Sequence, residues 1–134
     1  MTHMLDTNVC IDVIRNRSQL VRERLKSHPV DAIAVSAITL SELNHGVSKS
    51  SDSDANHLAL IEFLIPFAVL PYDDGAARAY GQIRAMLERQ GTPIGPMDLL
   101  IGAHAFSQGL ILVTNNEKEF LRIPGLLVEN WTTT

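Results

Sequence analysis

The chain has 134 residues, 46% of them apolar, which is enough to bury the core of one domain and leaves little room for two. The 11 basic and 15 acidic residues give a formal net charge of -4, which argues against a protein that binds nucleic acid over its whole surface. A single cysteine excludes an internal disulfide, and neither a secretory signal nor a membrane-length apolar stretch is present. We therefore expect one domain over residues 1–134 in a reducing, cytoplasmic setting.

The first half of the chain alternates short apolar runs with amphipathic stretches, which is the pattern of βαβ units. The predicted elements are a strand at 3–5, a turn at 6–8, helices at 9–15 and 19–27, a strand at 32–35 and a helix at 38–47. The second helix has a mostly basic polar face and ends before Pro29. The polar run 48–54 ends the last helix of this half.

The second half repeats the alternation. Its predicted elements are a helix at 57–67, a strand at 68–70, helices at 75–90 and 96–107, a strand at 110–113, a turn at 114–116, a helix at 117–121 and a strand at 126–128. The helix at 57–67 is too apolar around its circumference for a one-faced surface helix, so it requires burial or a partner. Asp74 is the expected cap of the next helix. The pattern predicts an α/β fold with about five strands, mostly parallel, and six or seven helices.

Four acidic residues lie near the ends of predicted elements. Asp6 follows the first strand, Glu42 lies one turn into the helix after the second, Asp98 begins a helix, and Glu119 follows the strand at 110–113. Ligands of open parallel sheets bind beyond the carboxyl ends of the strands, so these acids are expected to meet there. Carboxylates gathered in one cleft repel each other unless they are protonated or hold cations. Oxygen ligands of this kind favour Mg²⁺ or Mn²⁺.

Each acid also has an explanation that needs no function. Asp6 is a good N-cap for the helix that follows it, and Glu42 stands three residues after Thr39, which is the spacing of a capping box. Asp98 lies in the first turn of a helix, where the helix dipole favours an acid. Glu119 alone is expected to be a solvated acid on a helix surface. The joint placement of the four residues at one sheet edge carries the functional hypothesis.

Four blocks of this sequence resemble the motifs of PIN domains, and in particular of VapC-type toxins. They are Met4-Leu5-Asp6-Thr7-Asn8, Ser36-x-x-Thr39-x-x-Glu42-Leu43, Ile94-Gly95-Pro96-x-Asp98 and Thr114-Asn115-Asn116-x-x-Glu119-Phe120. The likeness spans almost the whole chain, with the blocks in the family's order. It implies a three-layer α/β/α sandwich with a central, mostly parallel sheet, and the activity of a metal-dependent endoribonuclease.

The resemblance also implies roles for individual residues. The acids that match Asp6 and Asp98 bind the divalent metal in such proteins, and the one that matches Glu42 completes the catalytic pocket. Thr7 and Thr114 would line the pocket with hydroxyls, and Glu119 would belong to its outer part. Many PIN domains have aspartate where this chain has Asn116, so a fourth carboxylate must come from Glu119 or be absent. An amide oxygen can coordinate a metal or orient a water, but it supplies no charge.

Partners follow from the same resemblance: a VapB-type antitoxin that covers the groove, a second copy of the chain, and a structured RNA. Enteric members of the family cut initiator tRNA in the anticodon loop, so tRNA is the favoured substrate. Basic side chains that could hold its phosphates are Arg15, Arg17, Arg22, Arg24, Lys26 and Arg84. The five histidines have no spacing typical of zinc sites, and His104 is expected to be a helix residue near the core.

Two other functions remain open at the level of sequence. An acidic cluster at a parallel sheet edge also describes a receiver domain of signalling proteins, although paired acids after the first strand and a lysine after the last strand are missing. A PIN fold without catalytic activity that acts as a binding module is the second alternative, because Asn116 replaces an acid. Metal-dependent RNA cleavage distinguishes the nuclease from both.

Overall fold

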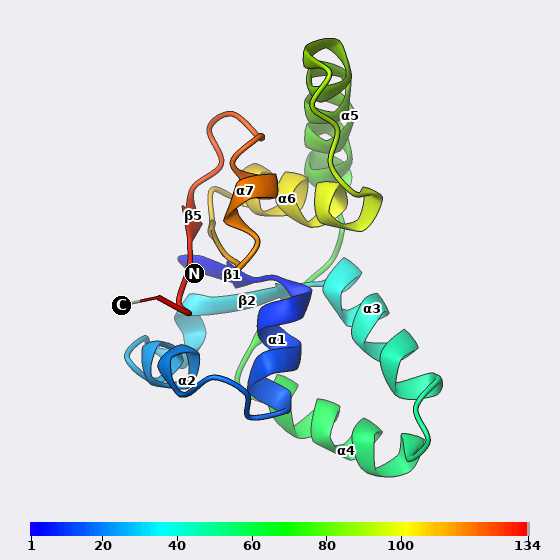
Figure 1. Ribbon diagram of the computed structural model, residues 1–134, viewed down its shortest axis with the longest axis vertical. Coiled ribbons are helices and arrows are strands. Elements are labelled where there is room, and N and C mark those ends of the chain that lie inside the picture. Colours follow the sequence, from blue (N-terminus) through cyan, green and yellow to red (C-terminus); the bar gives the residue numbers. More distant parts are fainter. Residues whose placement is uncertain (134) are drawn as a thin grey trace.

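The structure is a computed structural model that describes residues 1–133, in which helices cover both faces of a central sheet (Figure 1). Within these residues the strands are β1 (His3–Leu5), β2 (Ile33–Ser36), β3 (Ala68–Leu70), β4 (Ile111–Val113) and β5 (Val128–Glu129). Their order in the sheet is β3-β2-β1-β4-β5, and all neighbours are parallel. The predicted α/β/α sandwich is confirmed, and the sheet is parallel throughout.

The helices of the described chain are α1 (Thr7–Ile14), α2 (Gln19–Lys26), α3 (Ala37–Ser48), α4 (Ser53–Leu64), α5 (Asp74–Gln90), α6 (Pro96–Gln108) and α7 (Glu117–Phe120). A short 3-10 helix, Val30–Ala32, precedes β2. The expected elements are all present, with boundaries displaced by a few residues. No helix in residues 1–133 has both the length and the apolar character that a bilayer crossing requires.

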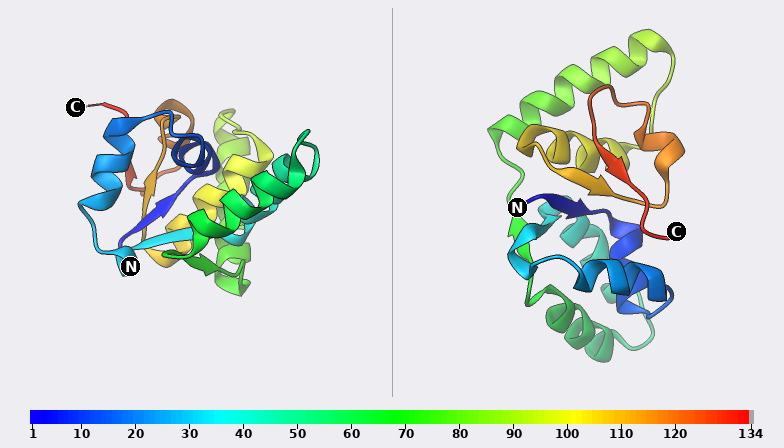
Figure 2. Two further views of the ribbon diagram at one scale, coloured as in Figure 1. Left: turned by 90° about the horizontal axis from the view of Figure 1, so that it is seen from below. Right: turned by 90° about the vertical axis from the view of Figure 1, so that its left-hand side faces the viewer.

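Two hydrophobic cores lie on opposite faces of the sheet. Met4 and Leu112 belong to one core, whereas Leu5 and Val113, their neighbours in sequence, belong to the other. Side chains alternate across a strand, and both faces here are covered by helices, so the inner strands β1, β2 and β4 are apolar at every position except His3 and Ser36. Helices α5, α6 and α7 pack against the first core and α1 to α4 against the second (Figure 2).

Capping side chains explain three corrections to the predicted boundaries. The helix after β1 begins at Thr7 rather than after a turn, because Asp6 itself caps it. Asp73 rather than Asp74 caps α5, since its carboxylate accepts the N–H of Ala76 at 2.9 Å. Asp52 caps α4, which therefore begins at Ser53, inside the polar run 48–54, rather than at residue 57. Short polar runs contain several possible caps, and tertiary packing selects among them.

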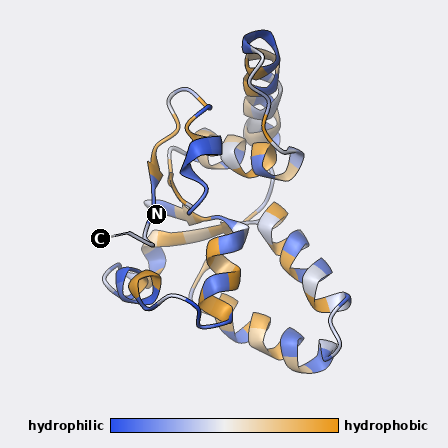
Figure 3. Ribbon diagram, in the orientation of Figure 1, coloured by the Kyte–Doolittle hydropathy of each residue, from blue (hydrophilic) through white to orange (hydrophobic). Residues whose placement is uncertain are grey.

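Helix α4 keeps much of its apolar surface exposed. Leu60 is its only buried residue, whereas Leu58 and Ile61 are 61% and 47% exposed. Hydrophobic residues lie around most of its circumference (Figure 3). The expectation that this helix requires burial or a partner is therefore only partly met within the chain itself.

Gly102 on α6 is a point of close contact with α7 and the segment that follows it. A Cβ built there would lie 2.6 Å from Ile123 Cδ1 and 3.3 Å from Phe120 Cδ1. We expect Gly102→Ala to lower the free energy of unfolding by about 1–3 kcal/mol through overpacking, measured by urea denaturation. Gly81 on α5 is the matched control, because a Cβ there meets nothing within 4 Å. Gly81→Ala is expected to stabilise the helix by roughly 0.5–1 kcal/mol, and an equal response of both variants would contradict the packing argument.

Candidate active site

Asp6 lies at the carboxyl end of β1, where the strand order reverses between β2 and β4. This is the topological switch point at which parallel sheets bind their ligands. The side chain is 3% exposed, and its Oδ1 accepts the N–H of Val9 at 2.9 Å. Asp6 is therefore the N-cap of α1, as the alternative explanation predicted, but a carboxylate has about four lone-pair sites, so capping the helix does not exclude a further partner.

The pKa of Asp6 is raised from 3.8 to about 6. Burial is the largest cause, and the charges of Asp98 and Asp12 act in the same direction. Hydrogen bonds from Thr114 and from the Val9 N–H act in the opposite direction. An ionised Asp6 is thus poorly solvated at neutral pH and would gain from a nearby cation.

Helix α3 carries the second acid of the site. Its N-cap is Ser36, so Thr39 and Glu42 lie inside the helix and the capping-box explanation of Glu42 is wrong. Thr7 Oγ1 donates to Glu42 Oε1 at 2.5 Å and lies 3.2 Å from the hydroxyl of buried Thr39. Because a hydroxyl has one proton, Thr39 must donate to Thr7 while Thr7 donates to the carboxylate. These contacts fix Glu42 beside the start of α1.

Asp98 lies in the first turn of α6, behind Pro96, as expected. Its pKa is raised to about 6 by burial first, and then by the negative charges of Glu119 and Glu42 and by a hydrogen bond with Glu119. The same residue also raises the pKa of Asp6. Asp98 is therefore the acid that links the other three, and this crowding raises its pKa in addition to burial.

Glu119 is held by neutral donors. Its Oε1 accepts the N–H of Gly95 at 2.6 Å, and its Oε2 accepts Asn116 Nδ2 at 2.8 Å. The Gly95 N–H is the main cause that holds the pKa of Glu119 below its usual value, and Asn116 adds to it. The explanation of Glu119 as an unattached solvated acid is wrong, since it ties α7 to the loop before α6. Asn116 serves here as a donor to this acid.

The four acids thus converge from β1, α3, α6 and α7 at one sheet edge, although in residues 1–133 no three of them are arranged closely enough to hold one ion together. The donor set fits a hard divalent cation. Asp6 and Asp98 are both destabilised as anions, by burial and by each other, and a cation between them would relieve that cost. Binding would require the Asp98 carboxylate to turn away from Glu119.

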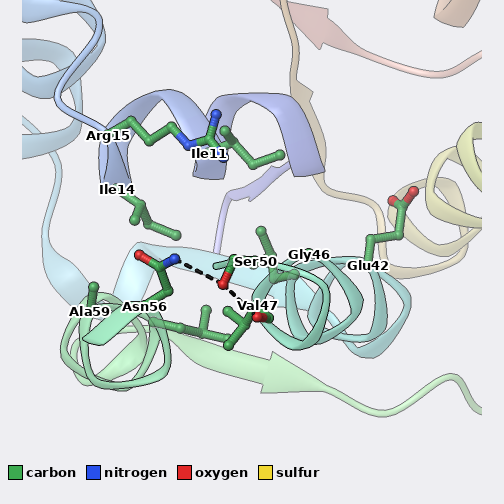
Figure 4. Close-up of a pocket in the computed structure, with 11 residues that line it drawn as sticks. Ile11, Ile14, Arg15, Glu42, Gly46, Val47, Ser50, Asn56 and Ala59 are labelled. Atoms are coloured by element: carbon green, nitrogen blue, oxygen red, sulfur yellow. Dashed lines mark hydrogen bonds between the residues drawn. The ribbon is translucent and has the colours of Figure 1, made fainter. Parts of the chain in front are cut away.

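A groove between α1, α3 and α4 continues from this edge, with a volume of about 210 Å³. Arg15 lies on its α1 side and Glu42 on α3 (Figure 4). Ser50 and Asn56 form its polar floor through a hydrogen bond of 3.0 Å. Arg15 is therefore the one basic candidate from the sequence that lines the same groove as a residue of the acidic cluster.

The remaining basic candidates lie elsewhere. Arg17 faces Asp12 at 3.8 Å, Arg22 donates to Asn16, and Arg24 lies 3.9 Å from Glu129. Lys26 is exposed at the end of α2. Arg84 lies on α5 next to the loop before α6, where it donates to Tyr80 at 2.9 Å. All of these side chains have local partners or face solvent, so none of them is tied to the acidic cluster.

Sequence reasoning missed two contributors to the site. The Gly95 N–H fixes Glu119, and Thr39 supports Thr7. Thr39 precedes Glu42 by three residues, so both lie on one face of a helix, although the same spacing also fits a capping box. A backbone N–H leaves no signal in the sequence, although a glycine next to proline marks a loop where a side chain can approach the backbone closely.

A cluster of acids at the switch point of a parallel sheet, with helices on both faces, defines an α/β protein with a candidate metal centre. The chain matches the PIN domain over residues 3–126 and belongs to the PIN-domain family. The receiver-domain alternative is therefore wrong.

Curated relatives narrow this assignment. The chain is 49% identical over 129 residues to the tRNA(fMet)-specific endonuclease VapC of Salmonella typhimurium, with 96% of each chain covered. It is 41% identical to ribonuclease VapC2 of Rickettsia felis, with 98% of each covered. Within the PIN family, the chain thus belongs with the VapC ribonucleases.

Solved structures agree with this placement. The DNA-bound VapBC complex of Salmonella typhimurium contains a chain with a TM-score of 0.93 at 46% identity, with 98% of both chains covered. VapBC2 of Rickettsia felis, bound to a DNA fragment from its promoter, gives a TM-score of 0.93 at 40% identity, with 98% of this chain and 99% of the other covered.

Proposed function

We propose that this chain is the toxin of a type II toxin–antitoxin pair and a Mg²⁺-dependent endoribonuclease that cuts tRNA, with the initiator tRNA anticodon loop as the favoured target. The observation that carries the proposal is the convergence of Asp6, Glu42 and Asp98 at the switch point of the sheet. The proposed tRNA substrate is supported by two relatives that are named tRNA(fMet)-specific endonuclease. They come from Salmonella typhimurium and Shigella flexneri, and each is 49% identical to this chain.

Asp6 and Asp98 would hold the metal, with Mn²⁺ as an alternative to Mg²⁺. When bound, such an ion lowers the pKa of a water and offsets the charge that develops on the phosphodiester. Glu42 would ligate as well or orient the attacking water, because Thr7 fixes its carboxylate. Glu119, held by Asn116 and the Gly95 N–H, would close the outer side of the site. Thr114 would hold Asp6 in place through its hydroxyl.

Arg15 is our first candidate for the phosphate contact, since it lines the groove that Glu42 also lines. A cation at the C-terminal end of α1 would offset the negative potential of the acids and draw an RNA backbone toward them. The other basic residues would contribute to longer-range attraction. This local placement reconciles RNA binding with a net charge of -4.

The partners we propose are a cognate VapB-type antitoxin and a second copy of the chain, as a homodimer or within a hetero-oligomer. The VapBC complexes among the structural relatives support the first partner. We also propose that residues 1–134 are a single PIN domain that acts in the cytoplasm, where tRNA is found.

The test is digestion of total tRNA by the purified protein, freed of antitoxin, with Mg²⁺ present. The expected result is one dominant cut, in initiator tRNA, that is lost with Asp6→Ala and suppressed when the antitoxin encoded beside the gene is added. Uncut tRNA, from a folded protein supplied with Mg²⁺, would favour the alternative of an inactive binding module. If the protein cuts other RNAs instead, the proposal that it is an endoribonuclease stands, and only the proposed tRNA substrate is wrong.

A further inference from the structure

A buried polar pair joins α6 to the junction of β2 and α3. His104 on α6 and Ser36 at the end of β2 are both 0% exposed, and His104 Nδ1 lies 2.8 Å from Ser36 Oγ. The same Oγ accepts the N–H of Ile38 at 3.0 Å and so caps α3. Breaking a hydrogen bond of this kind leaves two buried polar groups without partners, so the pair is a firm link between the two helices.

Packing alone does not explain a histidine at this position. Burial lowers the pKa of His104, against the opposing effects of the Asp73 charge and the Pro71 carbonyl, so the ring is neutral at pH 7. Ser36 Oγ already accepts one N–H, and its own proton is free to point at Nδ1. Within residues 1–133, His104 Nε2 is buried without a hydrogen-bond partner. An apolar side chain would avoid that cost but would lose the bond to Ser36.

The pair is placed to control the separation of two site acids. Glu42 follows Ser36 on α3 by six residues (36 to 42), and Asp98 precedes His104 on α6 by six residues (98 to 104). Six residues of helix span about 9 Å. A tilt of about 10° at the Ser36 junction would therefore move Glu42 by roughly 1.5 Å. Metal–ligand distances tolerate only about 0.2 Å, so such a tilt would matter.

We propose that His104 is a positioning residue, which fixes α3 against α6 through Ser36 and so sets the distance between Glu42 and Asp98. The inference rests on the proposed function, because it assigns these acids to one metal site. It assigns no contact between His104 and the substrate. The neighbouring Tyr72, whose ring meets that of His104 edge to face at 5.0 Å, shares the buried environment but makes no bond to Ser36.

The test compares His104→Leu, which removes the bond to Ser36, with His104→Asn, which keeps a polar atom near the Nδ1 position. We expect His104→Leu to bind Mn²⁺ about tenfold more weakly, as measured by calorimetry without RNA, because metal–ligand distances tolerate little displacement of Glu42. Its kcat should fall in the same proportion while KM for tRNA stays close to that of the parent. His104→Asn should restore most of both quantities, and Tyr72→Phe, the matched control, should change neither.

Mn²⁺ affinity separates this inference from the proposed function. If the parent binds Mn²⁺ but cuts no RNA, the function fails while the binding comparison still tests His104. A His104→Leu protein that unfolds more easily yet binds Mn²⁺ like the parent would overturn the proposal. His104 would then contribute only to the stability of the core. Should His104→Leu not fold, Ser36→Ala breaks the same bond, and parental Mn²⁺ affinity in Ser36→Ala would overturn the proposal equally.

Discussion

Asp98→Asn is expected to lower the rate of RNA cleavage on the order of a thousandfold while the protein stays folded and becomes slightly more stable. Asp98 is the acid that connects the others: burial first, and then the charges of Glu119 and Glu42, raise its pKa to about 6, and its own charge raises the pKa of Asp6 in turn. Its removal takes away a metal ligand and, in the metal-free protein, a source of repulsion. Cleavage of tRNA and a thermal melt in EDTA measure the two effects.

The sign of the stability effect follows from proton binding. The native state holds protons on Asp6 and Asp98 up to about pH 6, whereas the unfolded chain releases them near pH 3.8. The native state therefore binds more protons between these values, and stability without metal falls as the pH rises through that window. For Asp6, which is buried, the cost of ionisation at pH 7 is about 3 kcal/mol. Asp98 is half-buried, and solvent reduces its share.

Asp31→Asn is the control, because Asp31 is an exposed acid in the 3-10 helix that precedes β2, at the end of the strand opposite to the acidic cluster. It should leave both cleavage and melting temperature unchanged. If Asp98→Asn instead melts at a much lower temperature and still cleaves RNA, Asp98 only stabilises the start of α6 and does not belong to the site.

The sequence was most informative where a residue's role depends on local geometry. Asp6 was placed correctly because a strand end and a helix start are both read from adjacent residues, and the parallel sheet then puts that end at the switch point. Glu42 was placed in the right element, but its partner was not, because the hydroxyl of Thr7 lies 35 positions away in the chain. The contact between His104 and Ser36 spans 68 positions and has no periodic signal at all.

Helix boundaries failed for a related reason. Asp73 and Asp74 are equally good caps by residue type, and the backbone that enters α5 from β3 decides between them. The apolar face of α4 shows a second limit of sequence reasoning. Its hydrophobic pattern predicts burial or a partner, but part of this face is exposed in the structure. Hydrophobic pattern indicates that a face prefers to be covered, but it does not indicate which surface covers it.

Removal of divalent metal with EDTA is expected to abolish RNA cleavage, and Mg²⁺ or Mn²⁺ to restore it with an affinity that falls about a hundredfold between pH 7 and pH 5. Both Asp6 and Asp98 have a pKa of about 6, so each is mostly ionised at pH 7 and only about one-tenth ionised at pH 5. A metal that needs both carboxylates as anions must displace both protons at the lower pH, and the two tenfold costs multiply.

Calorimetry in buffers of different ionisation enthalpy measures this linkage directly. At pH 6 each of the two acids is about half protonated, so binding of one Mn²⁺ should release about one proton in total. In Asp98→Asn the release should fall to about half a proton, with weaker binding, since only Asp6 still titrates in this range. Binding that releases no proton, or an affinity that is the same at pH 5 and pH 7, would place the metal elsewhere on the molecule. RNA cleavage that persists in excess chelator would remove the metal from the reaction, and the crowding of Asp6 and Asp98 would then need another cause.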